Sequence, residues 1–313
     1  MNTKKIFSNP LLSVLLALVT CALWGSLFPF VKIGYSAFHI DSSDIPSIIL
    51  FAGIRFAVSG LIMIAFFSVM EKKLLFPTRR DVLPVGLAAL TGIVLHYAFT
   101  YLALSVGEGS KSAIIKQVGF LFLSCFSFVF IKDDKFSLKK LVCGCLGFFG
   151  IIVTNMDGGA FTFAAGDALL IVASLCSVVS TVVTKKAVEK TSPLTLVAYS
   201  QLSGGVLMCI CGMLLGGKIQ HFDMRSLAVF SYICIASIVA YSLWNVLIKY
   251  NSIAKLSLIK FTEPLFAVVL SGLFLRENIL KINYLLALII IFAAILMDNL
   301  HFENKKRKDS ANT

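Results

Sequence analysis

The sequence predicts an all-α polytopic membrane protein, with ten transmembrane helices arranged as two inverted five-helix repeats. Three observations support this fold class: the composition, a series of long apolar runs and a weak internal repeat. Of the 313 residues, 58% are hydrophobic and only 14% are charged, whereas about a quarter of the residues in a soluble domain are charged. We therefore expect most of the chain to lie within a lipid bilayer.

The apolar runs set the number of predicted helices. A stretch of about 20 apolar residues crosses the hydrocarbon core as a helix. The first run resembles a signal peptide, but it is too long for a cleaved leader and is followed by more spans, so we expect an uncleaved first helix. Little chain remains between the runs for a soluble domain. The ten runs cover residues 11–35, 46–70, 81–104, 110–130, 138–154, 162–186, 193–215, 225–250, 253–275 and 281–298.

The basic residues predict the orientation of the chain. If the N-terminus is cytoplasmic, 19 of the 28 Lys and Arg residues fall on the cytoplasmic side, 5 fall on the outer side and 4 fall within spans. This asymmetry follows the positive-inside rule. It also explains the net charge of +12 without a nucleic-acid partner. We expect an integral protein of the cytoplasmic (inner) membrane with both termini inside and a disordered tail, 299–313, that contacts anionic lipid.

An internal repeat relates the two halves of the chain. When the sequence is shifted by 144 residues, Tyr97 aligns with Tyr241 and Lys116 aligns with Lys260, and 12 of the 59 positions from 97 to 155 are identical. The repeat groups the spans into residues 11–154 and 162–298. Because five spans is an odd number, the second copy enters the membrane from the opposite side. Inverted repeats are typical of secondary transporters, which bind substrate near the midplane and work by alternating access.

The stretch ALWGSLFPFVKIG interrupts the first apolar run with polar or helix-breaking residues. Gly25, Pro29 and Lys32 share one face of a helix. Pro29 has no N–H, so the carbonyl of Gly25 needs another partner. We expect this face to look at protein and Lys32 to lie near the outer edge.

Three motifs resemble the drug/metabolite transporter superfamily, specifically the EamA family: LWGSLFPFVKIG, GIRF and FTEPLFAVVLSGLFLRENI. The resemblance covers the chain from about Leu11 to Asp298. It implies ten helices in two inverted repeats, a central cavity, and export or exchange of small metabolites. The family motifs fall on Trp24, Gly25, Lys32, Arg55, Glu263, Pro264 and Glu277.

The sequence also departs from the family pattern. Phe120 stands where the first repeat often has a proline, which puts a symmetric pair of helix breaks in doubt. Lys116 and Lys260 stand where the family usually has apolar or small residues. These two lysines are therefore the candidates for the specificity of this member.

Lys116 and Lys260 have two interpretations. Each lies about 10 Å from its nearer membrane edge, so the pair brackets the midplane. They either clamp an anionic group from two sides, since intramembrane charges usually face a cavity, or extend to the headgroups.

Other residues within the predicted spans also have two interpretations or a structural role. Glu263 either pairs with Lys260 beside a bend at Pro264 or carries a coupling proton. Arg55 either bonds carbonyls near a broken helix or contacts substrate. Tyr97 and Tyr241 are candidate cavity walls, and His96 is expected to pack with one bonded nitrogen.

The function predicted is a secondary transporter of small organic metabolites that favours anionic or zwitterionic substrates. The alternatives are an exporter of cationic or lipophilic compounds, and a membrane scaffold or enzyme without transport. The partners expected are a small-molecule substrate, a coupling proton or counter-substrate, and lipids. The sequence shows no catalytic, nucleotide-binding or metal-ligating motif, so neither enzyme activity nor a cofactor is expected. The predicted substrate-binding residues are Lys116, Lys260, Glu263, Arg55, Tyr97, Tyr241 and Trp24, and the predicted structural residues are Gly25, Pro29 and Pro264.

Overall fold

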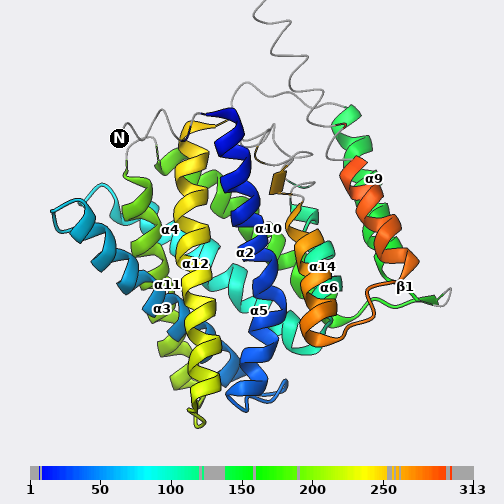
Figure 1. Cartoon of the computed structure of the whole chain (residues 1–313), viewed down its shortest axis with the longest axis horizontal. Helices are drawn as coiled ribbons and strands as arrows, with labels where there is room; N and C mark the ends of the chain where they lie inside the picture. The colour runs from blue at the N-terminus through cyan, green and yellow to red at the C-terminus, as the bar shows by residue number, and fades with distance from the viewer. Residues whose placement is uncertain are drawn as a thin grey trace, which may run out of the picture.

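The described chain is a bundle of apolar helices (Figure 1). A computed structural model describes residues 7, 9–119, 122, 138–157, 160–188, 191–251, 256, 259–260, 262–293 and 297. The predicted tail 299–313 and Phe120 lie outside these residues. The helices are α2 (Pro10–Ala37), α3 (Ile45–Met70), α4 (Val82–Ala88), the π-helix η1 (Ala89–Leu95), α5 (His96–Val106), α6 (Gly109–Ile115), α9 (Leu138–Thr154), α10 (Ala165–Ala187), α11 (Pro193–Leu214), α12 (Met224–Tyr250) and α14 (Thr262–Leu275), and a further helix covers Ile282–Ala293.

In the described part of the chain, six continuous helical stretches are long and apolar enough to cross a membrane, and one of them joins α4, η1 and α5. Shorter apolar helices cover Gly144–Thr154, Thr262–Leu275 and Ile282–Ala293. Many large apolar side chains face outward, among them Leu61 and Phe66 of α3, which are more than half exposed. An apolar outer surface of this kind fits a lipid environment. The six long helices span Leu11–Ala37, Ile45–Met70, Val82–Val106, Ala165–Ala187, Pro193–Leu214 and Met224–Tyr250.

The all-α prediction is correct for the described residues except for one short pair of strands. After α9, the strands β1 (Met156–Asp157) and β2 (Ala160–Phe161) pair antiparallel. The ladder is only two residues long on each side and lies at the end of the bundle where α10 begins. The protein is therefore a polytopic helical membrane protein, and its described residues include one minimal hairpin.

Local sequence fixes where several helices begin. The side chain of Asn9 accepts hydrogen bonds from the backbone N–H groups of Leu11 and Leu12, and Pro10 takes the first helical position of α2. Asp223 and Ser226 form a reciprocal capping box at the start of α12. Such caps satisfy N–H groups that have no partner within the helix.

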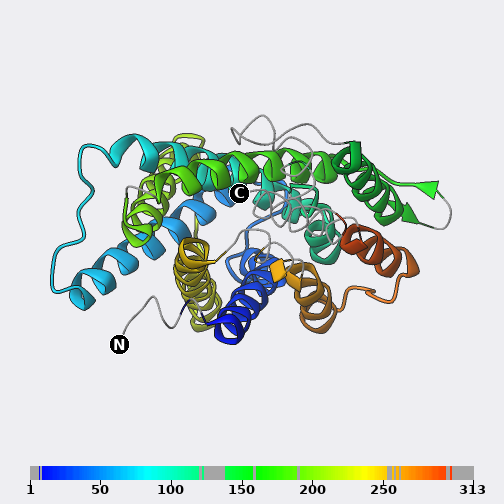
Figure 2. The ribbon, with the colours of Figure 1, turned by 90° about the horizontal axis from the view of Figure 1, so that it is seen from above.

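The helices form two layers when the bundle is seen from above (Figure 2). Helices α12, α2 and α14 form one layer, and α10 with the segment from α4 to α5 forms the other. Helix α2 packs against α12 and α14, whereas α10 packs against η1 and α5. Each layer thus combines helices from both halves of the sequence.

Helix α2 continues through Pro29 to Ala37. Gly25 lies directly against α14, because a Cβ atom at this position would come within 2.7 Å of the Glu263 carbonyl oxygen and 2.9 Å of the Ala267 nitrogen. The glycine therefore lets the backbones of α2 and α14 approach closely.

Helices α3 and α11 also pack through glycine. A Cβ atom on Gly205 would lie 2.2 Å from the backbone nitrogen of Ala57, and one on Gly53 would lie 2.5 Å from the nitrogen of Cys209. Gly212 packs on Leu50, whereas nearby Gly216 ends the helix with a φ of +89°. The small residues thus bring the two helix backbones into direct contact.

We expect Gly205→Ala to lower the thermal stability of the protein, because the added methyl group meets backbone that cannot move without separating α3 from α11. The cost of such overpacking is about 1–3 kcal/mol. Gly86→Ala is the matched control, since Gly86 lies in α4 with open space around it and alanine favours the helix. Equal melting temperatures for the two purified variants would contradict this account of the α3–α11 contact.

Candidate functional site

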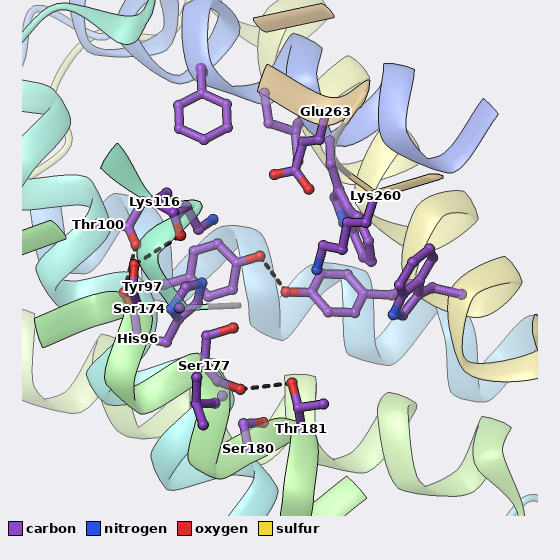
Figure 3. A pocket seen from close by; sticks show the side chains of 18 of the residues that line it. His96, Tyr97, Thr100, Lys116, Ser174, Ser177, Ser180, Thr181, Lys260 and Glu263 are labelled. Carbon is purple, nitrogen blue, oxygen red and sulfur yellow. Dashed lines mark hydrogen bonds between the residues drawn. The ribbon is translucent and has the colours of Figure 1, made fainter. Parts of the chain in front are cut away.

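A cavity of about 150 Å³ lies within the bundle. Helices α2, α3, η1, α5, α10, α12 and α14 contribute to its wall, together with residues that follow α6. Figure 3 shows this cavity from close by. The seven residues predicted to bind substrate all line it: Trp24, Arg55, Tyr97, Lys116, Tyr241, Lys260 and Glu263.

The ammonium groups of Lys116 and Lys260 lie against aromatic rings of the cavity wall. Lys116 Nζ is 5.3 Å from the ring centroid of Phe28, and Lys260 Nζ is 4.5 Å from that of Trp24 and 5.1 Å from that of Trp244. Aromatic faces attract cations at these distances. Both lysines are therefore turned inward, toward the cavity, rather than extended to the membrane edge.

The backbone beside Lys116 is interrupted within the membrane region. Helix α6 ends at Ile115, and the carbonyl of Lys116 accepts a hydrogen bond of 3.0 Å from the Ser174 hydroxyl of α10. A carbonyl that leaves a helix inside a membrane needs such a partner. The Ser174 hydroxyl thus stabilises the turn that presents Lys116 to the cavity.

Glu263 lies in the first turn of α14, and its carboxylate points into the cavity (Figure 3). The Lys260 side chain lies against the two tryptophan rings, and the ion pair between Glu263 and Lys260 stays a prediction.

Arg55 is fully buried at the centre of the bundle. Its guanidinium group donates hydrogen bonds to the hydroxyl groups of Tyr101 on α5 and Ser237 on α12, and it lies 4.5 Å from the ring centroid of Phe56. No carboxylate in the described residues forms an ion pair with it. These contacts make Arg55 a crosslink between α3, α5 and α12 that also contributes positive charge to the cavity wall.

Tyr97 and Tyr241 join the two halves of the chain at the cavity. Their hydroxyl groups form a hydrogen bond with each other, as Figure 3 shows. Trp24 packs edge-on against Tyr241 with ring centroids 5.4 Å apart. The two residues aligned by the internal repeat are thus direct partners.

His96 precedes Tyr97 and lines the same cavity. Its Nδ1 lies 2.7 Å from the carbonyl oxygen of Ala173 on α10. Because a carbonyl oxygen only accepts, Nδ1 must carry the proton. The hydrogen bond holds the ring against α10, as the sequence predicts for a packed histidine with one bonded nitrogen.

Sequence reasoning missed a row of hydroxyl groups on α10. Ser177, Ser180, Thr181 and Thr184 all line the cavity. They recur at helical spacing within SVVSTVVT, which places them on one face. That spacing was the available signal, but isolated Ser and Thr residues in a membrane helix often bond only to their own backbone.

Three ion pairs gather at one end of the bundle, and each joins a residue before β1 to one after it. Lys32 Nζ lies 3.5 Å from Glu277, Lys111 Nζ lies 2.9 Å from Asp167, and Lys281 Nζ lies 3.1 Å from Glu108. We call these three pairs the ionic latch.

The Glu277 carboxylate is the most connected group of the latch. Besides facing Lys32, it accepts hydrogen bonds from the backbone N–H groups of Gly109 and Ser110 and from the Ser110 hydroxyl, at 2.6–3.0 Å. Partial burial raises the pKa of this carboxyl, but the donors on Ser110 and Gly109 and the charge of Lys32 outweigh that effect and lower it. The Glu277 carboxyl therefore stays ionised at neutral pH.

Comparison with known proteins identifies the family. The profile of the EamA-like transporter family matches residues 11–156 and, separately, residues 164–297. The chain belongs to the EamA-like transporter family.

Similar proteins are also named as transporters. The chain is 28% identical over 295 residues to the "uncharacterized inner membrane transporter YedA" of Escherichia coli strain K12, covering 92% of this transporter and 90% of that protein. It is 24% identical over 270 residues to an "uncharacterized transporter" of Archaeoglobus fulgidus, covering 84% and 89% of the two chains. A solved crystal structure with 18% identity superposes with a TM-score of 0.64, covering 92% of this chain and 96% of that one, which shows a shared fold.

We expect Tyr101→Phe to destabilise this transporter by about 1.5–3 kcal/mol, because it removes a hydrogen bond to a buried charged group. Tyr199→Phe is the control. It also removes a hydrogen-bonded phenol hydroxyl, but that hydroxyl donates to the uncharged Leu75 carbonyl and not to a partner of Arg55. Thermal unfolding of the two purified variants compares the losses, and a smaller loss for Tyr101→Phe would show that Arg55 does not depend on this hydroxyl.

Proposed function

We propose that this protein is a secondary transporter that moves small organic anions or zwitterions across the inner membrane by alternating access. The observation that carries the proposal is the charge of the cavity wall. Arg55, Lys116 and Lys260 contribute three positive groups, and Glu263 contributes one negative group. A cavity with this excess attracts anions, and burial in a low-dielectric region strengthens the attraction.

The two kinds of charge suggest separate roles. Lys116 and Lys260 approach the cavity from opposite sides (Figure 3), so they serve as two contacts for a carboxylate or phosphate group. Glu263 faces the same space and serves as the contact for the ammonium group of a zwitterion or as the carrier of a coupling proton. Arg55 acts mainly through the helices that it joins.

The fold proposed for this function has ten helices in two inverted repeats, residues 11–154 and 162–298. The two separate matches to the family profile support this division. The packing also supports it, since α2 of the first half packs on α12 and α14 of the second, while α10 of the second packs on α5 and η1 of the first. The name of the E. coli relative supports an inner-membrane location, and the distribution of Lys and Arg supports cytoplasmic termini.

The ionic latch provides the outer closure in this scheme. Its residues lie at the C-terminal end of α2, at the N-terminal ends of α6 and α10, and between α14 and the helix Ile282–Ala293. All of these positions are at the outer end if the N-terminus is cytoplasmic. Each pair links the two halves, so opening toward the outside must separate all three pairs. The three intact pairs support the proposal that this arrangement is the outward-closed state of the cycle.

We expect Lys116→Met and Lys260→Met each to reduce anion counterflow in proteoliposomes by tenfold or more, because methionine keeps the length of the chain and removes the charge. Lys249→Met is the control, since Lys249 lies in the last turn of α12 and does not line the cavity. Unchanged uptake of every anion in a broad panel would overturn the site. Thermal stabilisation by dibasic or lipophilic compounds in place of anions would favour the alternative exporter.

We expect Glu277→Gln to open the outer side more often, because the neutral amide no longer attracts Lys32 and cannot accept as strongly from the N-terminus of α6. Leu104 is buried and lines the cavity, so a Leu104→Cys probe in a background without native cysteines reports outer access. A membrane-impermeant maleimide added from outside should react about fivefold faster in Glu277→Gln. Glu71→Gln is the control, because Glu71 follows the C-terminus of α3 and is not part of the latch. Equal maleimide reaction rates in the two variants would rule out the latch.

A further inference from the structure

The face of α10 that lines the cavity carries hydroxyl groups whose hydrogen-bonding capacity is not used by the described protein. Ser174 bonds the Lys116 carbonyl, and Thr181 bonds the carbonyl of Ser177 in its own helix. The hydroxyls of Ser177, Ser180 and Thr184 form no hydrogen bond with any described residue. We call these three residues the hydroxyl track, which extends over about 10 Å of helix.

The neighbouring helix leaves room for the track. A Cβ atom on Gly92 of η1 would lie 2.2 Å from the Ser180 hydroxyl oxygen. Any other residue at position 92 would therefore push this hydroxyl away. Gly92 itself lines the cavity, so the π-helical segment and the track meet at the same part of the wall.

Two residues of the cavity wall carry buried polar atoms without a hydrogen-bond partner among the described residues. They are Trp24, with its Nε1 donor, and Gln117, with its Oε1 acceptor. Trp24 is 7% exposed and Gln117 is 2% exposed. Buried polar groups are nearly always paired in folded proteins, so a ligand that both accepts and donates hydrogen bonds is the kind that this part of the wall suits.

The volume limits the size of that molecule. A group the size of a water molecule occupies about 10–15 Å³ of cavity volume. A cavity of about 150 Å³ therefore holds a ligand of about ten non-hydrogen atoms. Lys116 and Lys260 supply the positive charge on the wall. The ligand must therefore be small, anionic and rich in groups that both donate and accept.

From these observations we infer that the cavity selects small polyhydroxylated carboxylates over apolar carboxylates of the same length. The inference rests on the proposed anion site and adds its specificity. The carboxylate lies toward Lys116 and Lys260, and the hydroxyl groups lie along Ser177, Ser180 and Thr184. A hydroxyl group is the substituent that satisfies a serine, a tryptophan N–H and a glutamine carbonyl alike.

The test compares binding of matched ligands to the full-length protein in lipid nanodiscs. Aldonates of four and five carbons (threonate and xylonate) are titrated beside butyrate and pentanoate, with threitol as the uncharged polyol. We expect at least one aldonate to bind tenfold or more tightly than the alkanoate of equal length. Threitol should bind more weakly than the aldonate, since it lacks the charge.

The variant Ser177→Ala/Ser180→Ala tests the track itself. Loss of one hydrogen bond reduces affinity by about fivefold, so the double variant should bind aldonates at least tenfold more weakly and bind alkanoates within about twofold of the parent. Ser203→Ala is the control, because the Ser203 hydroxyl lies on α11 and bonds only the Tyr199 carbonyl of its own helix. The melting temperature of each variant without ligand shows that the fold is intact.

The outcomes separate the two proposals. Equal affinity for aldonates and alkanoates overturns the hydroxyl track and leaves the anion site in place. An equal loss of both ligand classes in the double variant also overturns it. If no anion binds at all, the anion site fails, and the specificity proposed here fails with it.

Discussion

The positive charge of Arg55 in the middle of the bundle constrains the helices around it. A guanidinium group removed from water must be hydrogen-bonded, because an unsatisfied buried charge costs several kcal/mol. Tyr101 and Ser237 meet that need from α5 and α12, and the ring of Phe56 covers one face. Tyr35 of α2 then donates a hydrogen bond to the Tyr101 carbonyl. One residue on α3 thus joins α5 and α12 directly, and Tyr101 links the same centre to α2.

The cavity exists because the helices around this centre are not all regular. Helix α6 ends at Ile115, and the wide π-helical turn η1 leads directly into His96. Such irregular segments are expensive in lipid unless other groups satisfy their backbone. Ser174 satisfies the carbonyl of Lys116, so the irregular backbone is tolerated where it borders the cavity. The same interruptions place polar side chains where regular apolar helices would have filled the space.

The close packing of α3 on α11 and the ionic latch give the molecule two different kinds of contact between its halves. Gly53 and Gly205 allow direct backbone packing, which is lost abruptly when the helices separate. The pair of Lys32 with Glu277 lies at the bundle end and is partly exposed, so its free energy is smaller and sensitive to charge. A firm interface in one place and a weaker, polar one in another is what the proposed rocking motion between the halves requires.

The sequence by itself determined the membrane location, the family and the approximate ends of six long helices. The length of an apolar run and the distribution of basic residues are local properties of the sequence, and both relate directly to the thickness and sidedness of a bilayer. It also identified Lys116, Lys260 and Glu263, since a charge in an apolar run is conspicuous. Only the tertiary structure decided that Lys260 lies against the tryptophan rings, that Glu277 caps α6, and that Tyr97 meets Tyr241. The hydroxyl track of α10 was equally hidden, because whether a serine bonds its own backbone or faces a cavity depends on neighbours far away in the chain. Side-chain direction and long-range partners are set by packing, and a single sequence records the residues but not their contacts.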